Sequence, residues 1–501
     1  TTVGAQEYID ADVKVVDAGG RLVLPGLHDV HLHPLEAGSS IVSCVLDSTL
    51  SIEEQEETIS DCAEDEGANG WVLGWGHSLE ELQEDGRNPK EILDELIPDR
   101  PVVIMEETSH SVWVNSKALI AAGINKNTPA PQGGAILHTN SQPNGILLDT
   151  AGDLIFDIAY APNKIIAEKN YKGLIHSLGE ISKNGITSLV NARVYWKRGN
   201  LDVWKRVENE GLLTARTVQS LWAYPLEDDT KQLLKLKSLY SNDPDRLMRV
   251  SQIKFYSDGI IHNSTAAMLE PYKQYFAEVG KYGLNYFTQS RLTKYVSELE
   301  LAGFDMHIHA IGSRAVRESL NSIESAIEKN GDDLNRRHRL THVELVDAED
   351  RSRFNSLGVT ADFQVAGDFT LPDNHKWQEP QIGTRYKDLY PVRDIYNIGA
   401  LVTLSSDWDV SKLNPFVGMQ NALELDDQSL PNIDAVIKAY TLNGAYVMRQ
   451  EQDAGSIEVG KFGDLIIVDQ DVTSISVNSI SNTKVLLTLL GGKTVYTTNS
   501  L

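Results

Sequence analysis

The sequence has few cysteines. Its 501 residues include only two, Cys44 and Cys62. Two thiols cannot build a scaffold of several disulfides, and they cannot supply a thiolate-rich zinc site. The pair leaves open either a single disulfide or two free thiols.

Long apolar runs and an excess of positive charge are also missing. No apolar run approaches the ~20 residues that span a bilayer, so we expect no membrane-spanning segment. The 45 Lys and Arg residues are outnumbered by 71 Asp and Glu residues, which gives a formal net charge of −26. This charge disfavours nucleic acid and anionic membranes as partners. The charge says little about the substrate, because the local field in a cleft matters more than the total, and self-association into a homo-oligomer stays open.

The sequence begins at Thr1, without a methionine and already close to a strand pattern. We expect a trimmed N-terminus, so the compartment stays open between cytoplasmic and periplasmic or secreted.

From about residue 165, helical and strand patterns alternate along the chain. Strand patterns follow helical ones near residues 185, 215, 250, 303, 340, 359 and 399. With an earlier strand that runs through Val30 and Leu32, this makes eight. The alternation predicts an α/β fold with a (β/α)8 TIM barrel. The alternative is a doubly wound open sheet, which usually carries a glycine-rich phosphate loop after its first strand, and none is present.

The earlier strand carries two histidines, His31 and His33. Side chains two apart on a strand point to the same side, so both imidazoles can converge on one ion. Imidazole nitrogen is a good ligand for zinc and similar divalent metals. The alternative is two half-exposed histidines on an ordinary strand.

Further polar residues fall near the ends of the other expected strands. In a (β/α)8 barrel, the chemistry takes place at the C-terminal ends of the strands. The residues at these positions are His31, His33, Lys254, His307, His309, His342 and Asp407. We interpret this set as a candidate catalytic site.

Lys254 stands between Ile253 and Phe255 in this set. Burial among apolar neighbours lowers the pKa of a lysine. A neutral amine can add carbon dioxide to give a carbamate, whose oxygens can bridge two metals. The alternative is a lysine that forms an ion pair with Asp258.

Several motifs resemble those of a known family. The segment P-G-L-H-D-V-H-L-H at 25–33 resembles the opening of the amidohydrolase superfamily. The segments at 74–77, 109–124, 253–259, 309–316 and 404–415 resemble motifs of its YtcJ-like branch, also called amidohydrolase type 3. The resemblance extends over nearly the whole chain.

The resemblance implies three structural units. Residues 26–34 and 165–451 would form the barrel, and residues 35–164 an inserted α/β domain after the first strand. Residues 1–25 and 452–501 would form a small composite β-sandwich. The strand patterns at 13–17 and 21–24 are too short to build a core alone, which also indicates a partner elsewhere in the chain.

The resemblance also implies a metal centre with one or two divalent ions, expected to be Zn²⁺. Its ligands would be His31, His33, a carboxylated and bridging Lys254, His309, His342 and Asp407. On the fifth strand the motif H-A-I-G-S-R-A-V points to His309, which leaves His307 either as a substrate contact or as a residue that supports the ligands. In the inserted domain, the predicted substrate contacts are Trp75, His77, His110 and Trp113. The alternative for these four is a structural role inside that domain.

The activity implied by the resemblance is that of a metal-dependent amidohydrolase. Such an enzyme cleaves an amide or other C–N bond of a small molecule, not a peptide bond, with metal-activated water and Asp407 as the proton shuttle. Asp409 is the weaker candidate for the shuttle. Thr341 stands where the branch usually has glutamate. The alternatives are a lactone or ester hydrolase with the same site, and an inactive barrel used for binding or regulation.

Overall fold

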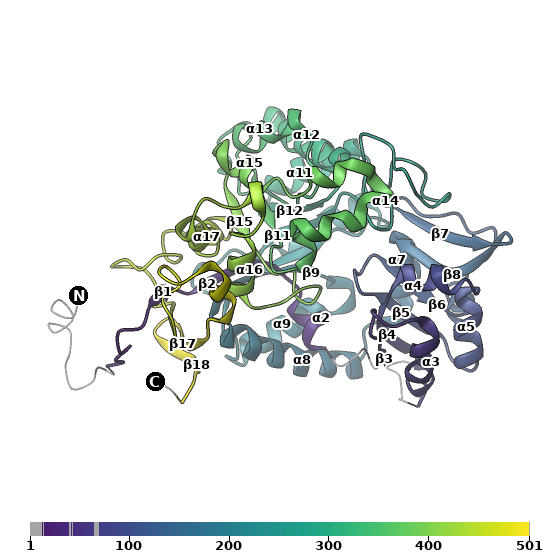
Figure 1. Cartoon of the computed structure of the whole chain (residues 1–501), viewed down its shortest axis with the longest axis horizontal. Coiled ribbons are helices and arrows are strands. Elements are labelled where there is room, and N and C mark those ends of the chain that lie inside the picture. Colours follow the sequence, from purple (N-terminus) through teal and green to yellow (C-terminus); the bar gives the residue numbers. More distant parts are fainter. Residues whose placement is uncertain (1–12, 14, 40–41, 43, 65–69, 500–501) are drawn as a thin grey trace.

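An eight-stranded sheet forms the centre of the molecule (Figure 1). The computed structural model describes residues 13, 15–39, 42, 44–64 and 70–499. Neighbouring strands of the central sheet are parallel throughout. In sheet order they are β2 (Leu27–Leu32), β9 (Ile186–Val194), β10 (Arg216–Trp222), β11 (Met248–Tyr256), β12 (Asp305–Ala310), β13 (Arg339–His342), β14 (Thr360–Phe363) and β15 (Val402–Leu404). The predicted (β/α)8 barrel is confirmed.

Backbone hydrogen bonds just beyond the first and last strands join the two edges of this sheet. The amide of Asp407 donates to the carbonyl of His31 (2.8 Å), and the amide of His33 donates to the carbonyl of Trp408 (2.5 Å). The barrel therefore closes at the C-terminal ends of β2 and β15, where the candidate residues lie.

Helices connect consecutive strands and bury one face against the barrel. In α12, buried residues recur every three or four positions, from Ala315 and Val316 to Ile323 and Ala326, as an amphipathic helix requires. The helices around the barrel are α8 (Lys164–Lys183), α9 (Asn200–Asn209), α10 (Asp229–Leu239), α11 (Gln289–Glu300), α12 (Ser313–Asn330), α13 (Ala348–Ser356), α15 (Val392–Asn397), α16 (Pro415–Asn421), α17 (Ile433–Ala439) and α18 (Leu442–Val447).

Shorter helical segments lie in the connections. They are α2 (Pro34–Gly38), α14 (Glu379–Ile382), η3 (Trp196–Arg198), η4 (Asp368–Thr370), η5 (Pro372–Gln378), η6 (Gly383–Asp388), η7 (Asp426–Gln428) and η8 (Val477–Asn482). Among the described residues, no helix combines the length and the apolar character needed to span a membrane.

The two ends of the chain share one antiparallel sheet. Its strands, in order, are β1 (Val23–Pro25), β16 (Leu465–Val468), β17 (Val485–Leu490) and β18 (Lys493–Thr497). Gly185, which leads into β9 with φ +76°, packs against this sheet: a Cβ there would lie 3.1 Å from Val485. The strand predicted at 13–17 is not formed in residues 13 and 15–17, and residue 14 lies outside the described residues. The exact domain boundaries stay a prediction.

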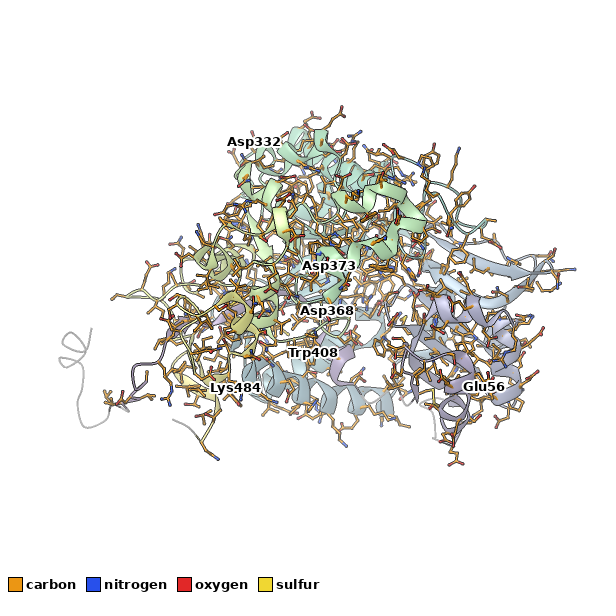
Figure 2. The ribbon with its side chains drawn as sticks, viewed as in Figure 1. Glu56, Asp332, Asp368, Asp373, Trp408 and Lys484 are labelled. Carbon is orange, nitrogen blue, oxygen red and sulfur yellow. A yellow bond between two sulfur atoms is a disulfide. The ribbon has the colours of Figure 1, made fainter. Side chains whose placement is uncertain are left out.

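A second, mixed sheet lies between β2 and β9 in the sequence, with the order β3-β4-β5-β6-β8-β7. Its strands are β3 (Cys44–Val45), β4 (Val72–His77), β5 (Val102–Glu106), β6 (Ser111–Val114), β7 (Gly134–Thr139) and β8 (Gln142–Asp149). Its helices are α3 (Ile52–Asp61), α4 (Leu79–Asp85), α5 (Pro89–Leu96), α6 (Ser116–Ala121) and α7 (Thr150–Ala159). A disulfide joins Cys44 to Cys62, so the two cysteines are not free thiols. Figure 2 shows this inserted unit, marked by Glu56, and the terminal sheet, marked by Lys484, at opposite sides of the molecule.

Candidate active site

The end of β2 carries His31 and His33 into the mouth of the barrel. Because residues two apart on a strand face the same side, both imidazoles point toward Asp407, which follows β15. Nε2 of His31 lies 3.2 Å from Oδ1 of Asp407, and Nε2 of His33 lies 3.1 Å from the same oxygen. All three residues are buried. The first and last strands thus meet at one carboxylate oxygen.

A chain of hydrogen bonds orients His31. Its Nδ1 lies 2.7 Å from the hydroxyl oxygen of Thr341, and that hydroxyl donates to Oδ2 of Asp362 (3.0 Å). With its proton on Nδ1, His31 presents the lone pair of Nε2 to Asp407. Two acceptors at this separation favour a cation between them. A metal-binding histidine typically donates a hydrogen bond from its other ring nitrogen, as Nδ1 of His31 does here to Thr341.

Asp407 adopts a left-handed backbone conformation with φ +57°. Its position is held by the hydrogen bond from its amide to the carbonyl of His31. Burial acts to raise the pKa of Asp407, but the neighbouring His31, His33 and His342 together bring it well below its usual value. The side chain is therefore a carboxylate at neutral pH, and it can bind a cation or accept a proton.

Lys254, on β11, is completely buried in the same mouth. Its Nζ lies 3.3 Å from Nε2 of His31 and 3.4 Å from Nε2 of His307. Burial lowers the pKa of Lys254 well below its usual value, which favours the neutral amine. The alternative ion pair with Asp258 is not formed, because that carboxylate accepts hydrogen bonds from the amides of Ala267, Ile311 and Gly312.

The two histidines of β12 differ in which nitrogen is available. Arg339 donates to Nδ1 of His307 (2.8 Å), so the lone pair of Nδ1 is used and the proton of a neutral ring is on Nε2. Nε2 of His309 lies 3.0 Å from the carbonyl of Gly259, to which it can only donate. Nδ1 of His309 is buried and has no hydrogen-bond partner among the described residues. The free lone pair is therefore on His309.

His342 ends β13 with φ +72°, and its ring lies next to that of His309, with 4.4 Å between the centroids. Its Nδ1 is 4.0 Å from Oδ2 of Asp407. His31, His342 and Asp407 each offer a ligand atom within 4.8 Å of the others, and so do His31, His307 and Asp362. The donors of the first group fit a divalent metal ion. In the second group the ring of His307 has no free lone pair, because its Nδ1 accepts from Arg339.

The predicted contacts from the inserted unit separate into two groups. His110 reaches the barrel: its Nδ1 lies 2.7 Å from Oδ1 of Asp149, and its ring lies 5.2 Å from that of His309. His110 and Trp75 both border the cavity that contains Asp407, His309 and His342. His77 and Trp113 do not border this cavity.

His77 and Trp113 lie inside the inserted unit. Nε1 of Trp113 donates to the carbonyl of Pro89 (2.7 Å), and Nε2 of His77 lies 3.3 Å from Oγ of Ser111. Both side chains are buried in that unit, which agrees with the structural alternative for these two residues.

A cavity of about 330 Å³ opens above Asp407, His309 and His342. Its wall includes Glu344, a buried acid whose pKa is raised by burial to about 7. Neither this residue nor Asp362 is among the residues predicted from the sequence. A signal for Asp362 existed: it is an acid inside the apolar segment V-T-A-D-F at the seventh strand.

The model of the Amidohydrolase family matches residues 14–496. The chain belongs to this family. It is 25% identical over 511 residues to YtcJ of Bacillus subtilis, covering 98% of this chain and 92% of that protein. It is also 25% identical over 511 residues to the N-substituted formamide deformylase of Arthrobacter pascens, covering 97% of this chain and 90% of the relative.

A solved structure shows the same fold. An uncharacterized metal-dependent hydrolase from Pyrococcus horikoshii OT3 superimposes with a TM-score of 0.71 at 22% identity, covering 95% of this chain and 91% of the other. The predicted YtcJ-like amidohydrolase is confirmed. Family and site together support a hydrolase that uses a divalent metal.

Proposed function

We propose that the chain hydrolyses an amide or another C–N bond of a small molecule. The observation that carries the proposal is the convergence of His31 and His33 on Asp407, where Nε2 of each imidazole lies within 3.2 Å of Oδ1 of the carboxylate. A formamide-cleaving relative that aligns over 97% of this chain supports the choice of a C–N bond.

The proposed metal ligands are His31, His33, Lys254, His309, His342 and Asp407. When bound, a Zn²⁺ ion there would lower the pKa of water toward neutrality and polarise a substrate carbonyl. The complete burial of Lys254, which favours a neutral amine, supports its carboxylation, and this would add the anionic oxygens that a second ion needs. His307 instead positions Lys254 and is held by Arg339.

Asp407 is the proposed proton shuttle. Asp407 is a carboxylate that borders the cavity, so it can accept the proton of the attacking water and then donate it to the leaving amine. The hydrogen bond from the amide of Asp407 to the carbonyl of His31 keeps this residue at the floor of the cavity. Asp409, two residues further, borders a different cavity and is a poor alternative.

The test is metal content and turnover for wild type and Asp407→Asn, with Asp409→Asn as the matched control. Asparagine keeps the size and one coordinating oxygen, so most of the metal should stay. Turnover of formamides, N-acyl amines or N-acyl amino acids should fall by roughly 10²–10⁴-fold in Asp407→Asn, the usual contribution of general acid–base catalysis.

Three results would contradict the proposal. Near-normal turnover in Asp407→Asn, or a larger loss in Asp409→Asn, would mean that Asp407 is not the proton shuttle. Hydrolysis of lactones or esters but of no amide would replace the C–N bond as the target.

A further inference from the structure

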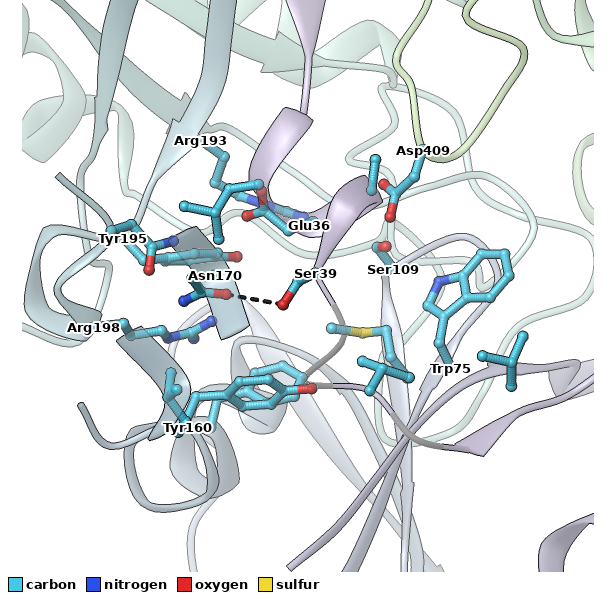
Figure 3. Close-up of a pocket in the computed structure, with 18 residues that line it drawn as sticks. Glu36, Ser39, Trp75, Ser109, Tyr160, Asn170, Arg193, Tyr195, Arg198 and Asp409 are labelled. Atoms are coloured by element: carbon cyan, nitrogen blue, oxygen red, sulfur yellow. Dashed lines mark hydrogen bonds between the residues drawn. The ribbon is translucent and has the colours of Figure 1, made fainter. Parts of the chain in front are cut away.

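A second cavity, of about 300 Å³, lies between the barrel and the inserted unit (Figure 3). Its apolar wall comes from both parts, with Leu35 in α2, Met105 in β5 and Phe156 in α7. Trp75 borders this cavity and also the one that contains Asp407. The two cavities are therefore neighbours.

Arg198, at the end of η3, extends into this second cavity at the side opposite Trp75 (Figure 3). Its guanidinium carbon lies 3.7 Å from the ring centroid of Tyr195 and 5.5 Å from that of Tyr160. The side chain is only 12% exposed, and its ion-pair distance to Asp153 is a long 4.0 Å. Nε and Nη2 are buried without a hydrogen-bond partner among the described residues.

These two nitrogens form one edge of the planar guanidinium. That edge matches the two oxygens of a carboxylate, which accept both N–H bonds in parallel. The aromatic ring of Tyr195 stabilises the face of the cation but leaves its edge free. Buried donors without acceptors are unfavourable, so this edge is suited to a ligand that enters the cavity.

Two further groups of the cavity support an anion. Arg193, near the end of β9, donates from Nη1 to the hydroxyl of Tyr256 (2.9 Å), and its Nε has no partner in the described part of the chain. Both carboxyl oxygens of Glu36 are likewise buried and unpartnered there. Burial raises the pKa of Glu36 to about 7, against the opposing effect of Arg193. A protonated Glu36 can donate to an anion.

The cavity also contains a group that would repel an anion. Asp409 lies on the same side as Trp75 (Figure 3). An anion is therefore expected at the far side, beside Arg198.

We propose that this cavity binds a carboxylate group of the substrate, with Nε and Nη2 of Arg198 as a bidentate anchor. The inference rests on the proposed function, because it gives the substrate class of that site. The class is amides that carry a carboxylate some distance from the C–N bond that is cleaved. Because Arg198 and Asp407 border two different cavities that share Trp75, the substrate needs a spacer of several bonds between these groups.

The test uses matched pairs of amides on the zinc-loaded full chain. Each pair is an N-acyl amino acid with one to six carbons between nitrogen and carboxylate, and the same compound ending in a neutral alcohol. We expect wild type to prefer the acid by roughly 10- to 100-fold in kcat/KM at one or more of the longer spacers, the size of a charged hydrogen-bonded pair. Arg198→Gln should abolish most of this preference.

The control is Arg206→Gln in α9. Arg206 is an arginine with 45% side-chain exposure that pairs with Glu168 and Glu210 at the surface, so its loss should leave the acid-to-alcohol ratio unchanged. The wild-type comparison needs no variant and stands even if Arg198→Gln does not fold.

A binding measurement separates this inference from the proposed function. Calorimetric titration of the same acids and alcohols into Asp407→Asn needs no turnover. Suppose that wild type hydrolyses no amide. Tighter binding of the acid than of the alcohol, lost by roughly 10- to 100-fold when Arg198→Gln is added, would still support the carboxylate site. Equal affinity and equal kcat/KM for acid and alcohol at every spacer in wild type overturns it, and so does an unchanged ratio in Arg198→Gln.

Discussion

Histidines lie at both ends of the neighbouring strands β12 and β13, but their ring nitrogens differ in hydrogen bonding. At the N-terminal end, Nδ1 of His338 accepts from the amide of Met306 (3.1 Å), and its Nε2 donates to Glu300 (3.0 Å). At the C-terminal end, Nδ1 of His309 has no partner among the described residues. One ring is fully paired by the protein, whereas the other keeps a free lone pair.

The carboxylates at the two ends show the same contrast. Asp305 accepts two hydrogen bonds from Arg449 (2.6 and 2.9 Å), and Glu300 accepts two from Arg336 (2.8 and 2.9 Å). Asp407, at the opposite end, faces imidazole nitrogens instead of arginines. Identical residue types therefore stabilise the fold at one end and remain available for an ion and for chemistry at the other.

Replacement of the two β12 histidines should sharpen this contrast most. His309→Gln removes a proposed direct ligand with a free lone pair, so zinc affinity should fall by more than the roughly 10- to 100-fold that an outer partner costs. His307→Gln should cost at most that amount, because its ring is held by Arg339 and acts on Lys254. Equilibrium zinc titration with a competing chelator measures both.

The unfolding temperature of the metal-free proteins serves as the control, since a global defect would lower it. A greater loss of zinc affinity in His307→Gln than in His309→Gln would reverse the assignment.

Much of the barrel mouth was predictable because strand ends depend on local patterns. The alternation of His31 and His33 on one strand is enough to place both on one side, and the alternating helices place each strand end at the same rim. The choice between His307 and His309 is different, since both lie on the same face. Arg339 and Gly259, which are distant in sequence, decide which nitrogen is free.

Distant neighbours also decide what other motif residues contact. Asp258 was the alternative partner of Lys254, but its carboxylate accepts hydrogen bonds from three backbone amides. His77 and Trp113 belong to motifs of the inserted unit, yet their side chains pack inside it. The cavity around Arg198 combines parts of the inserted unit, the barrel and the loop after β15, so no local motif could indicate it.

Loss of His338 should affect stability and leave the metal unchanged. His338→Leu keeps the side-chain size but leaves the buried amide of Met306 without an acceptor and removes one hydrogen bond from Glu300. Such a loss costs about 1–3 kcal/mol. Thermal unfolding should show a lower midpoint, while zinc content and affinity stay at the wild-type level. Reduced zinc affinity with an unchanged midpoint would mean that the N-terminal end of the strands is not purely structural.

The smallest expected effect is a pH dependence at the same end. Burial acts to raise the pKa of Glu300, but Arg336, His338 and Asn330 bring it down to about 2 from its usual 4.5. A carboxyl whose folded pKa is depressed contributes stability that is present above its unfolded pKa and is lost as the pH falls through the folded value. Wild type should therefore lose this contribution between about pH 5 and about pH 2.

The variant Glu300→Gln lacks this contribution at every pH. It should therefore be less stable than wild type at pH 6, and the difference in unfolding midpoint between the two should shrink steadily on acidification. A difference that stays constant over this range would show that the Glu300 carboxylate owes its contribution to packing and not to its charge.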